Sequence, residues 1–180
     1  MKIFLFPIIL LLTITSCKIQ GLTNDYSKLN DDQKKKITQL TSFEKLDNEQ
    51  IYKINGSQLN EELKKYPKSI VYIFKNGCTS KLCKPLFVYE NYAKENGYKL
   101  FLVMNGYAHL NETLEQHVST TLFSIDNEYY KSNYRSTYMR YFENELSSKP
   151  IDTKVKEFLG NIYFFKSNQL EKIIKELPKT

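Results

Sequence analysis

The sequence has few of the residues that bind zinc, since it contains only three Cys and two His. It also has only six Gly and five Pro, and it has no Trp. His109 and His117 are eight positions apart. On one helix they would be separated by ~12 Å along the axis, which is too far for both to bind one ion. Neither His is close to a Cys in the sequence. We therefore expect no metal site and no cofactor.

The sequence also lacks a basic patch and a nucleic-acid-binding motif. Its formal net charge is +6, but lysines are interleaved with acidic residues, as in EELKKYPK and LEKIIKELPKT. The run of lysines from Lys34 to Lys36 directly follows Asp31 and Asp32. Because nucleic-acid-binding domains gather positive charge on one face, this pattern predicts a solvated surface and no nucleic-acid partner.

What is present suits one packed domain. The 180 residues are 41% hydrophobic and 26% charged, and 14 Tyr and 11 Phe supply much of the apolar mass. These proportions are typical of a globular core and exclude a disordered chain. No internal repeat is visible in the sequence.

The first 16 residues have the pattern of a signal peptide. MKIFLFPIILLLTITSC begins with one Lys, continues with an apolar run and ends with small polar residues before Cys17. The run is too short to span a bilayer of ~30 Å comfortably. Its end, ITSC, resembles the lipobox of bacterial lipoproteins. That resemblance implies lipidation of Cys17 and anchoring of the chain to a membrane of the bacterial cell envelope, facing the periplasm. A conventional signal peptide with an incidental Cys17 is the alternative.

The segment from residue 17 to 47 is polar and rich in lysine. We interpret it as a lipid-anchored tether with one short helix after Asp31 and Asp32, whose charges suit the start of a helix. A domain from residue 48 to 180 follows. Lys18 comes directly after Cys17. Since an Asp there favours the inner membrane in bacterial lipoproteins, we expect the outer membrane.

If Cys17 carries a lipid, Cys78 and Cys83 remain as a pair. An exported chain meets an oxidising compartment, so this pair is expected to form a disulfide in at least one state. Four residues lie between the two Cys. On a regular helix they would point about 140° apart and be ~7.5 Å apart along the axis. Because a disulfide requires Cα atoms within ~7 Å, Cys78 must lie in a loop or the first helical turn must distort.

From about residue 50 the sequence alternates between strand and helix patterns. Continuous apolar runs predict buried strands, and apolar residues spaced by three or four predict helices. The expected strands are residues 51–55, 69–74, 98–104, 120–126, 161–166 and 170–177, and the expected helices are 58–66, 80–97, 109–117 and 127–146. The last two strands form a hairpin that bends at residues 166–169. This order predicts an α/β fold with a mostly parallel central sheet, helices on both faces and an antiparallel C-terminal hairpin.

The segment from Ile51 to the C-terminus resembles the thioredoxin-like superfamily. The resemblance rests on SIVYIF leading into NGCTSKLCK, the helix after it and the late hairpin IYFFKSNQLEKII. It implies a three-layer sandwich in which a buried strand delivers Cys78 to the start of a helix. There a positive dipole favours the thiolate. Lys75, Lys81 and Lys84 add positive charge. The implied chemistry is thiol–disulfide exchange with a protein partner, in which Cys78 attacks and Cys83 resolves.

The sequence departs from the pattern of the superfamily at two places that bear on this function. Peroxiredoxins of the same superfamily have Thr or Ser and then Pro where this chain has Lys75 and Asn76, so peroxidase activity is not expected. The cis-proline that thioredoxins place before the late strand has no counterpart in EFLGNIYFF. Three roles therefore stay open for Cys78 and Cys83: a redox-active dithiol, a structural disulfide, or a degenerate site on a non-catalytic binding module.

Overall fold

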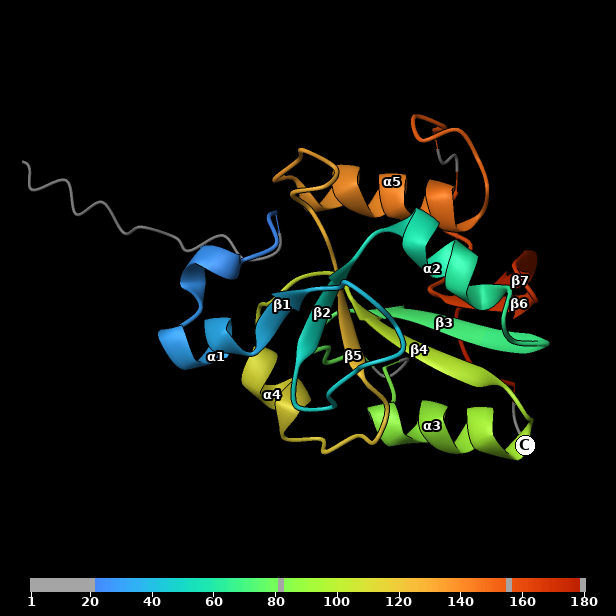
Figure 1. The fold of residues 1–180 in the computed structure, drawn as a ribbon, viewed down its shortest axis with the longest axis horizontal. Coiled ribbons are helices and arrows are strands. Elements are labelled where there is room, and N and C mark those ends of the chain that lie inside the picture. The colour runs from blue at the N-terminus through green and yellow to red at the C-terminus, as the bar shows by residue number, and fades with distance from the viewer. Residues whose placement is uncertain (1–21, 81–82, 155–156, 179–180) are drawn as a thin grey trace, which may run out of the picture.

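The computed structural model describes residues 22–80, 83–154 and 157–178. They form an α/β fold with one mixed sheet and helices on both of its faces (Figure 1). Cys17 and the predicted signal peptide lie outside the described residues. Within the described ranges, none of the helices is both long and apolar enough to cross a membrane.

The elements follow one another as the sequence predicts from residue 51 on. The strands are β1 (Ile37–Gln39), β2 (Ile51–Ile54), β3 (Lys68–Phe74), β4 (Lys99–Met104), β5 (Leu122–Ile125), β6 (Ile162–Lys166) and β7 (Gln169–Ile174). The helices are the short 3-10 turn η1 (Tyr26–Lys28) and α1 (Asp31–Lys35), α2 (Gly56–Leu63), α3 (Leu86–Glu95), α4 (Leu110–Leu114) and α5 (Arg135–Leu146).

The sheet has seven strands in the order β1-β2-β5-β4-β3-β6-β7. The first five in this order run parallel to one another, whereas β6 is antiparallel to both β3 and β7. The mostly parallel sheet and the antiparallel C-terminal hairpin are therefore confirmed. Because parallel strands share one direction, the loops that follow β2, β3, β4 and β5 meet at one end of the sheet.

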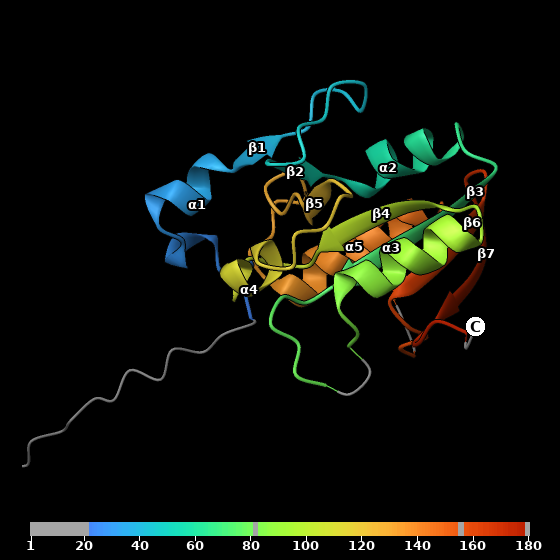
Figure 2. The same cartoon turned by 90° about the horizontal axis from the view of Figure 1, so that it is seen from below.

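The two faces of the sheet have separate hydrophobic cores. On one face α2 and α5 pack together, and Leu59, Leu63, Tyr138 and Phe142 are fully buried. On the other face α3 and α4 bury Leu86 and Leu110. Figure 2 shows the sheet from below, with α2 and α3 separated by the strands. Coverage on both sides explains why the central strands are continuous apolar runs and do not alternate.

Polar caps set the starts of two helices. Asn55 before α2 accepts a hydrogen bond from the Gln58 backbone N–H at 2.8 Å, and the Gln58 side chain accepts one from the Asn55 N–H at 3.1 Å. Asn30 and Gln33 make the same reciprocal pair at α1. These capping boxes satisfy N–H groups that have no partner within the helix.

The predicted helix over residues 127–146 is too long at its start. Asp126 Oδ1 accepts hydrogen bonds from the backbone N–H groups of Glu128 and Tyr129, which bends the chain into a turn. Lys131 then has a positive φ of 50°, which is incompatible with a helix. Helix α5 begins only at Arg135. Tyr134, which directly precedes α5, is 67% exposed, whereas Tyr138 and Phe142 within the helix are buried.

The segment before residue 48, which the sequence predicts as a tether, contributes η1, α1 and β1 to the fold. The short helix expected after Asp31 and Asp32 is α1. Strand β1 extends the sheet by pairing in parallel with β2, in the register Ile37 to Ile51. Leu29 and Leu40 are buried against the two cores. From residue 22 onward the chain is therefore packed against the domain.

Candidate functional site

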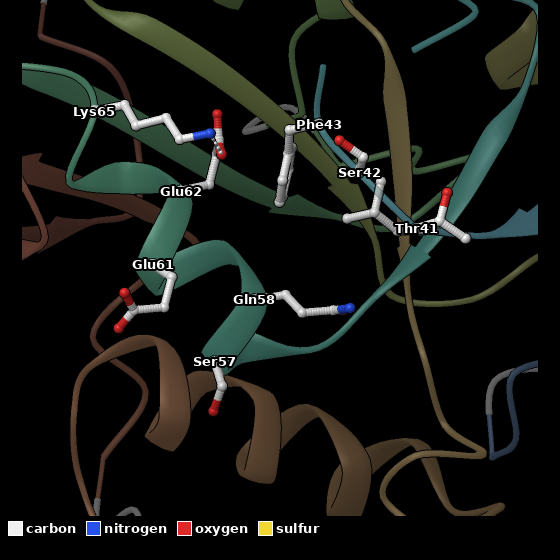
Figure 3. Close-up of a pocket in the computed structure, with 9 residues that line it drawn as sticks. Thr41, Ser42, Phe43, Ser57, Gln58, Glu61, Glu62 and Lys65 are labelled. Atoms are coloured by element: carbon white, nitrogen blue, oxygen red, sulfur yellow. Dashed lines mark ion pairs between the residues drawn. The ribbon is translucent and has the colours of Figure 1, made fainter. Parts of the chain in front are cut away.

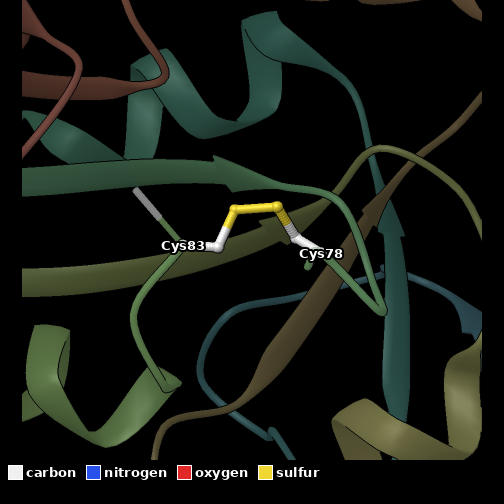
Figure 4. The surroundings of a disulfide bond; sticks show 2 residues. All are labelled: Cys78 and Cys83. Carbon is white, nitrogen blue, oxygen red and sulfur yellow. A yellow bond between two sulfur atoms is a disulfide. The ribbon is translucent and has the colours of Figure 1, made fainter. Parts of the chain in front are cut away.

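The candidate site is the loop between β3 and α3, where Cys78 and Cys83 form a disulfide (Figure 4). Their Cα atoms are 6.0 Å apart, within the range that a disulfide requires. Both residues are half-buried, and Thr79 and Ser80 next to Cys78 are exposed. The backbone N–H of Cys83 donates to the Ser80 carbonyl at 2.9 Å. The disulfide is thus within reach of solvent.

The expectation that Cys78 sits at the start of a helix is wrong. Helix α3 begins at Leu86, so both cysteines precede it in the loop. The reason is Pro85, which disfavours helical backbone at the residue before it and directly precedes the first helical residue. The Leu86 N–H is already bound by Gln116 Oε1 at 2.8 Å. The helix dipole therefore gives no reason to expect an acidic thiol at Cys78.

The loop is fixed on its N-terminal side by the buried side chain of Asn76. Its amide donates to the Gly106 carbonyl at 2.9 Å and accepts from the Thr113 hydroxyl at 2.8 Å. Asn76 is 2% exposed and Thr113 is 1% exposed. These bonds connect the loop after β3 to the loop after β4 and to α4. Such buried polar groups stabilise a structure when both hydrogen-bonding partners are present.

Gly77, which directly precedes Cys78, has a left-handed backbone and very little space around it. Its φ is 61°, and a Cβ atom here would lie 2.7 Å from the Cβ of His109 and 2.9 Å from Glu112 Oε2. His109 Nδ1 in turn lies 2.9 Å from Glu112 Oε1. The pair His109 and Glu112 therefore packs directly against the backbone that carries Cys78.

The disulfide opens into a pocket of about 290 Å³. Tyr72 and Phe74 of β3, Leu86 of α3 and the two cysteines line it, together with polar and charged side chains of the surrounding loops. The charged members include Lys75 and Lys84, both exposed, and Glu112. The rings of Tyr72 and Tyr89 stack with centroids 3.9 Å apart. Burial raises the pKa of both tyrosines, so both hydroxyls stay protonated at neutral pH.

A second pocket, of about 560 Å³, lies on the other side of the fold. Thr41, Ser42 and Phe43 line it from the loop after β1, and Ser57, Gln58 and Glu61 line it from α2 (Figure 3). Its Glu62 and Lys65 form an ion pair at 2.8 Å. No Cys or His is among the residues that line this pocket. It therefore has no thiol or imidazole, and the paired cysteines lie at the other pocket.

The two histidines are not brought together on one helix. His109 is the N-cap residue of α4, and His117 lies beyond the end of this helix. Both have positive φ angles, 56° and 46°. Among the described residues, no group of three His, Cys, Asp or Glu side chains is arranged to hold a metal ion. The backbone of the described ranges also contains no cis peptide bond.

The sequence predicts the two cysteines of the site but not the residues that support their loop. The supporting residues are Thr113, His109, Glu112 and Gln116, which lie about 30 residues or more after the cysteine loop. No local pattern links these positions to Asn76 or Leu86. The glycine before Cys78 is the one local signal of this support, because a glycine next to a candidate nucleophile often marks a position where only glycine fits.

Comparisons with known proteins add no identification. No protein-family model matches the chain. No curated protein and no solved structure matches it either.

Proposed function

We propose that the protein is a lipid-anchored, thioredoxin-like thiol–disulfide oxidoreductase of the bacterial periplasm that works through Cys78 and Cys83. The observation that carries the proposal is the disulfide itself: it is half-buried, borders a pocket and follows a central strand of the sheet. An oxidised pair that solvent can reach is what exchange requires. The lipidation of Cys17 and the outer-membrane location belong to the same proposal and rest on the lipobox resemblance.

The reaction needs two thiols and a substrate disulfide. In the reduced protein the Cys78 thiolate attacks one sulfur of the substrate disulfide, which forms a mixed disulfide and releases the first substrate thiolate. Cys83 loses its proton to water, and its thiolate then attacks Cys78 Sγ. The Cys78–Cys83 disulfide forms and the second substrate thiolate leaves. The substrate gains two electrons, and a partner dithiol returns two electrons to the protein.

The support for Cys78 as the attacking residue is its position on the fixed part of the loop. It follows Asn76 and Gly77 directly, and both are held against the loop after β4 and the start of α4. A nucleophile on a fixed backbone loses less freedom when it attacks. Lys75 and Lys84 at the pocket favour an anionic sulfur, whereas Glu112 opposes it.

Peroxidase chemistry is not part of the proposal. Lys75 is exposed and has no hydroxyl to bind a peroxide. The amide of Asn76 is occupied by Gly106 and Thr113. The side chains that precede Cys78 therefore give a peroxide no donor of the kind that peroxiredoxins use.

The test is reduction of insulin disulfides by the purified chain with dithiothreitol as the electron source. We expect activity in the unaltered protein and none in Cys78→Ser. Cys83→Ser should stop at the mixed disulfide, because the resolving thiol is missing. Circular dichroism must first show that both variants fold. Unchanged turnover in folded Cys78→Ser would overturn the proposal.

The second candidate is a non-catalytic binding module with a structural disulfide. It is favoured by the absence of a cis peptide bond in the described ranges and by the lack of a helix N-terminus at Cys78. On this view the disulfide only closes the loop. Alkylation of the reduced protein separates the two candidates: a thiol that reacts rapidly at neutral pH supports exchange, and two inert thiols support the module.

A further inference from the structure

The N-terminal segment is bound firmly to the start of α5. The Leu22 carbonyl accepts a hydrogen bond from the Arg135 backbone N–H at 2.8 Å. The Arg135 guanidinium donates to the Thr23 carbonyl at 2.8 Å and contacts Asp25 Oδ2 at 3.2 Å. The Asp25 side chain is 1% exposed and that of Arg135 is 10% exposed. Because separating the pair would leave the Asp25 carboxylate buried without this partner, the contact holds the segment against α5.

Two more hydrogen bonds join the same segment to the loops that follow β4 and β5. The Tyr107 backbone N–H donates to the Asn24 carbonyl at 2.7 Å, and the Asn24 side chain donates to Asn127 Oδ1 at 2.6 Å. Tyr107 follows β4 and Asn127 follows β5. The chain therefore enters the domain at the end of the sheet where the parallel strands finish.

The disulfide lies at this same end. A Cβ on Gly106 would be 2.6 Å from Arg135 Nη2, so this guanidinium packs against the Gly106 backbone. The Gly106 carbonyl accepts the hydrogen bond from Asn76, which lies two residues before Cys78. A continuous series of contacts thus runs from Leu22 through Arg135 and Gly106 to the cysteine loop. Figure 2 shows the loop after β3 beside α4 at this end of the sheet.

The distance from the lipid to the domain is limited by the sequence. Four residues, 18 to 21, separate Cys17 from Leu22. Because an extended chain spans at most ~3.6 Å per residue, the Cα atoms of Cys17 and Leu22 lie within ~18 Å of each other. A lipid on Cys17 would therefore hold this end of the domain at the membrane surface.

The side chains beside the entry point suit a lipid surface. Leu22 is 56% exposed and Tyr134 is 67% exposed, and Tyr134 directly precedes the residue that binds the Leu22 carbonyl. Lys131 in the preceding turn is exposed as well. Tyrosine is enriched at membrane–water interfaces, and lysine is attracted to anionic headgroups. An exposed aromatic and an exposed aliphatic side chain next to the anchor would bury apolar area on contact with lipid.

We propose that the end of the sheet that carries Leu22, Tyr134 and the cysteine loop lies against the bilayer, with lipid as the partner of Leu22 and Tyr134. This orientation rests on the anchor at Cys17 that is part of the proposed function. Its consequence is that the disulfide works close to the headgroups. Partner thiols presented near the membrane surface reach it, whereas large soluble partners are hindered.

The test uses the absence of Trp from the chain. Tyr134→Trp places a single indole beside the entry point. Asn96→Trp places one at an exposed position before β4, at the opposite end of the sheet. Each lipidated full-length variant is reconstituted into phosphatidylethanolamine and phosphatidylglycerol vesicles with brominated acyl chains, which quench nearby indoles. We expect strong quenching at residue 134 and little at residue 96. Equal quenching, or none at either position, would overturn the orientation.

Two controls separate this inference from the function. Flotation of the vesicles shows whether the chain is anchored, and chains that do not float overturn both the anchor and the orientation. Insulin reduction by the same samples reports on exchange. Loss of the quenching difference with exchange intact removes only the orientation. Quenching as expected without exchange removes only the redox function.

Discussion

Asn76 and Gly106 lie in different loops, and the side-chain amide of Asn76 donates a hydrogen bond to the Gly106 carbonyl at 2.9 Å. The same side chain accepts from the Thr113 hydroxyl. This one buried side chain therefore ties the cysteine loop to the loop after β4 and to helix α4. The disulfide is held in place by contacts that lie outside the cysteine motif.

Asn76→Ala should destabilise the protein and loosen the cysteine loop. The change leaves the Gly106 carbonyl and the Thr113 hydroxyl buried without this partner, which costs about 1–3 kcal/mol of unfolding free energy. Urea denaturation measures the loss. Asn91→Ala, at an exposed position on α3, is the matched control and should have little effect. Equal stabilities of the two variants would show that the network does not anchor the loop.

Gly77→Ala should be more damaging than Gly97→Ala. Both glycines have positive φ angles, 61° and 69°, so either alanine is strained by about 1–2 kcal/mol. A Cβ at Gly97 meets nothing within 4 Å, whereas one at Gly77 would lie 2.7 Å from His109. Crowding of this kind adds about 1–3 kcal/mol. Thermal unfolding of the two variants measures the difference. Equal losses would mean that His109 moves aside freely.

The stability of the protein should depend on pH through Glu143. Burial raises the pKa of this carboxyl to about 7, and the hydrogen bond from Tyr163 only partly offsets the effect. The ordinary pKa is 4.5, so between pH 4.5 and about 7 the folded chain keeps a proton that the unfolded chain releases. The free energy of unfolding contributed by this group therefore falls by about 3 kcal/mol as pH rises through this window, and it no longer changes with pH above the window.

Glu143→Gln removes that dependence, because the amide does not titrate. The variant should gain stability over the unaltered protein at pH 8 and should show little gain at pH 4. Glu157→Gln, at an exposed position beside the same small cavity, should not produce this difference. A gain for Glu143→Gln that is the same at both pH values would contradict the account.

Arg135→Ala should release the N-terminal segment. It removes the guanidinium from the buried Asp25 carboxylate and from the Thr23 carbonyl, and breaking a buried ion pair costs about 3–5 kcal/mol. Lys28 also contacts Asp25, so the loss should lie at the low end of this range. Lys35→Ala breaks an exposed ion pair with Asp32 and should be nearly neutral. Limited proteolysis before α1 measures the release, and equal protection in both variants would count against it.

The sequence predicts the central strands well, because a strand that is buried on both faces is apolar at nearly every position. The runs around Ile70 and Leu102 are apolar at every position, and they form neighbouring central strands. Helix starts are harder to predict, because they depend on single residues. Pro85 delays α3 beyond the cysteines, and the Asp126 side chain turns the chain before α5.

The site can be predicted only in part from the sequence, because some of its contacts join residues that are far apart in the chain. The sequence predicts the pairing of Cys78 and Cys83, because they are the two cysteines that remain when Cys17 is assigned to a lipid. The contact between Asn76 and Thr113 spans 37 positions and exists only once β4 lies beside β3. Local sequence patterns contain no information on such contacts. The hydrogen bonds that support the cysteine loop can therefore be identified only from the folded structure.

Trapping the exchange intermediate tests the central claim most directly. Reduced Cys83→Ser is mixed with a peptide disulfide at neutral pH, and the products are digested and weighed by mass spectrometry. The account predicts a mixed disulfide between the peptide and Cys78, and rapid release of the peptide when Cys83 is present. A folded variant whose Cys78 forms no adduct, while the same thiol is fully modified after denaturation, would contradict it.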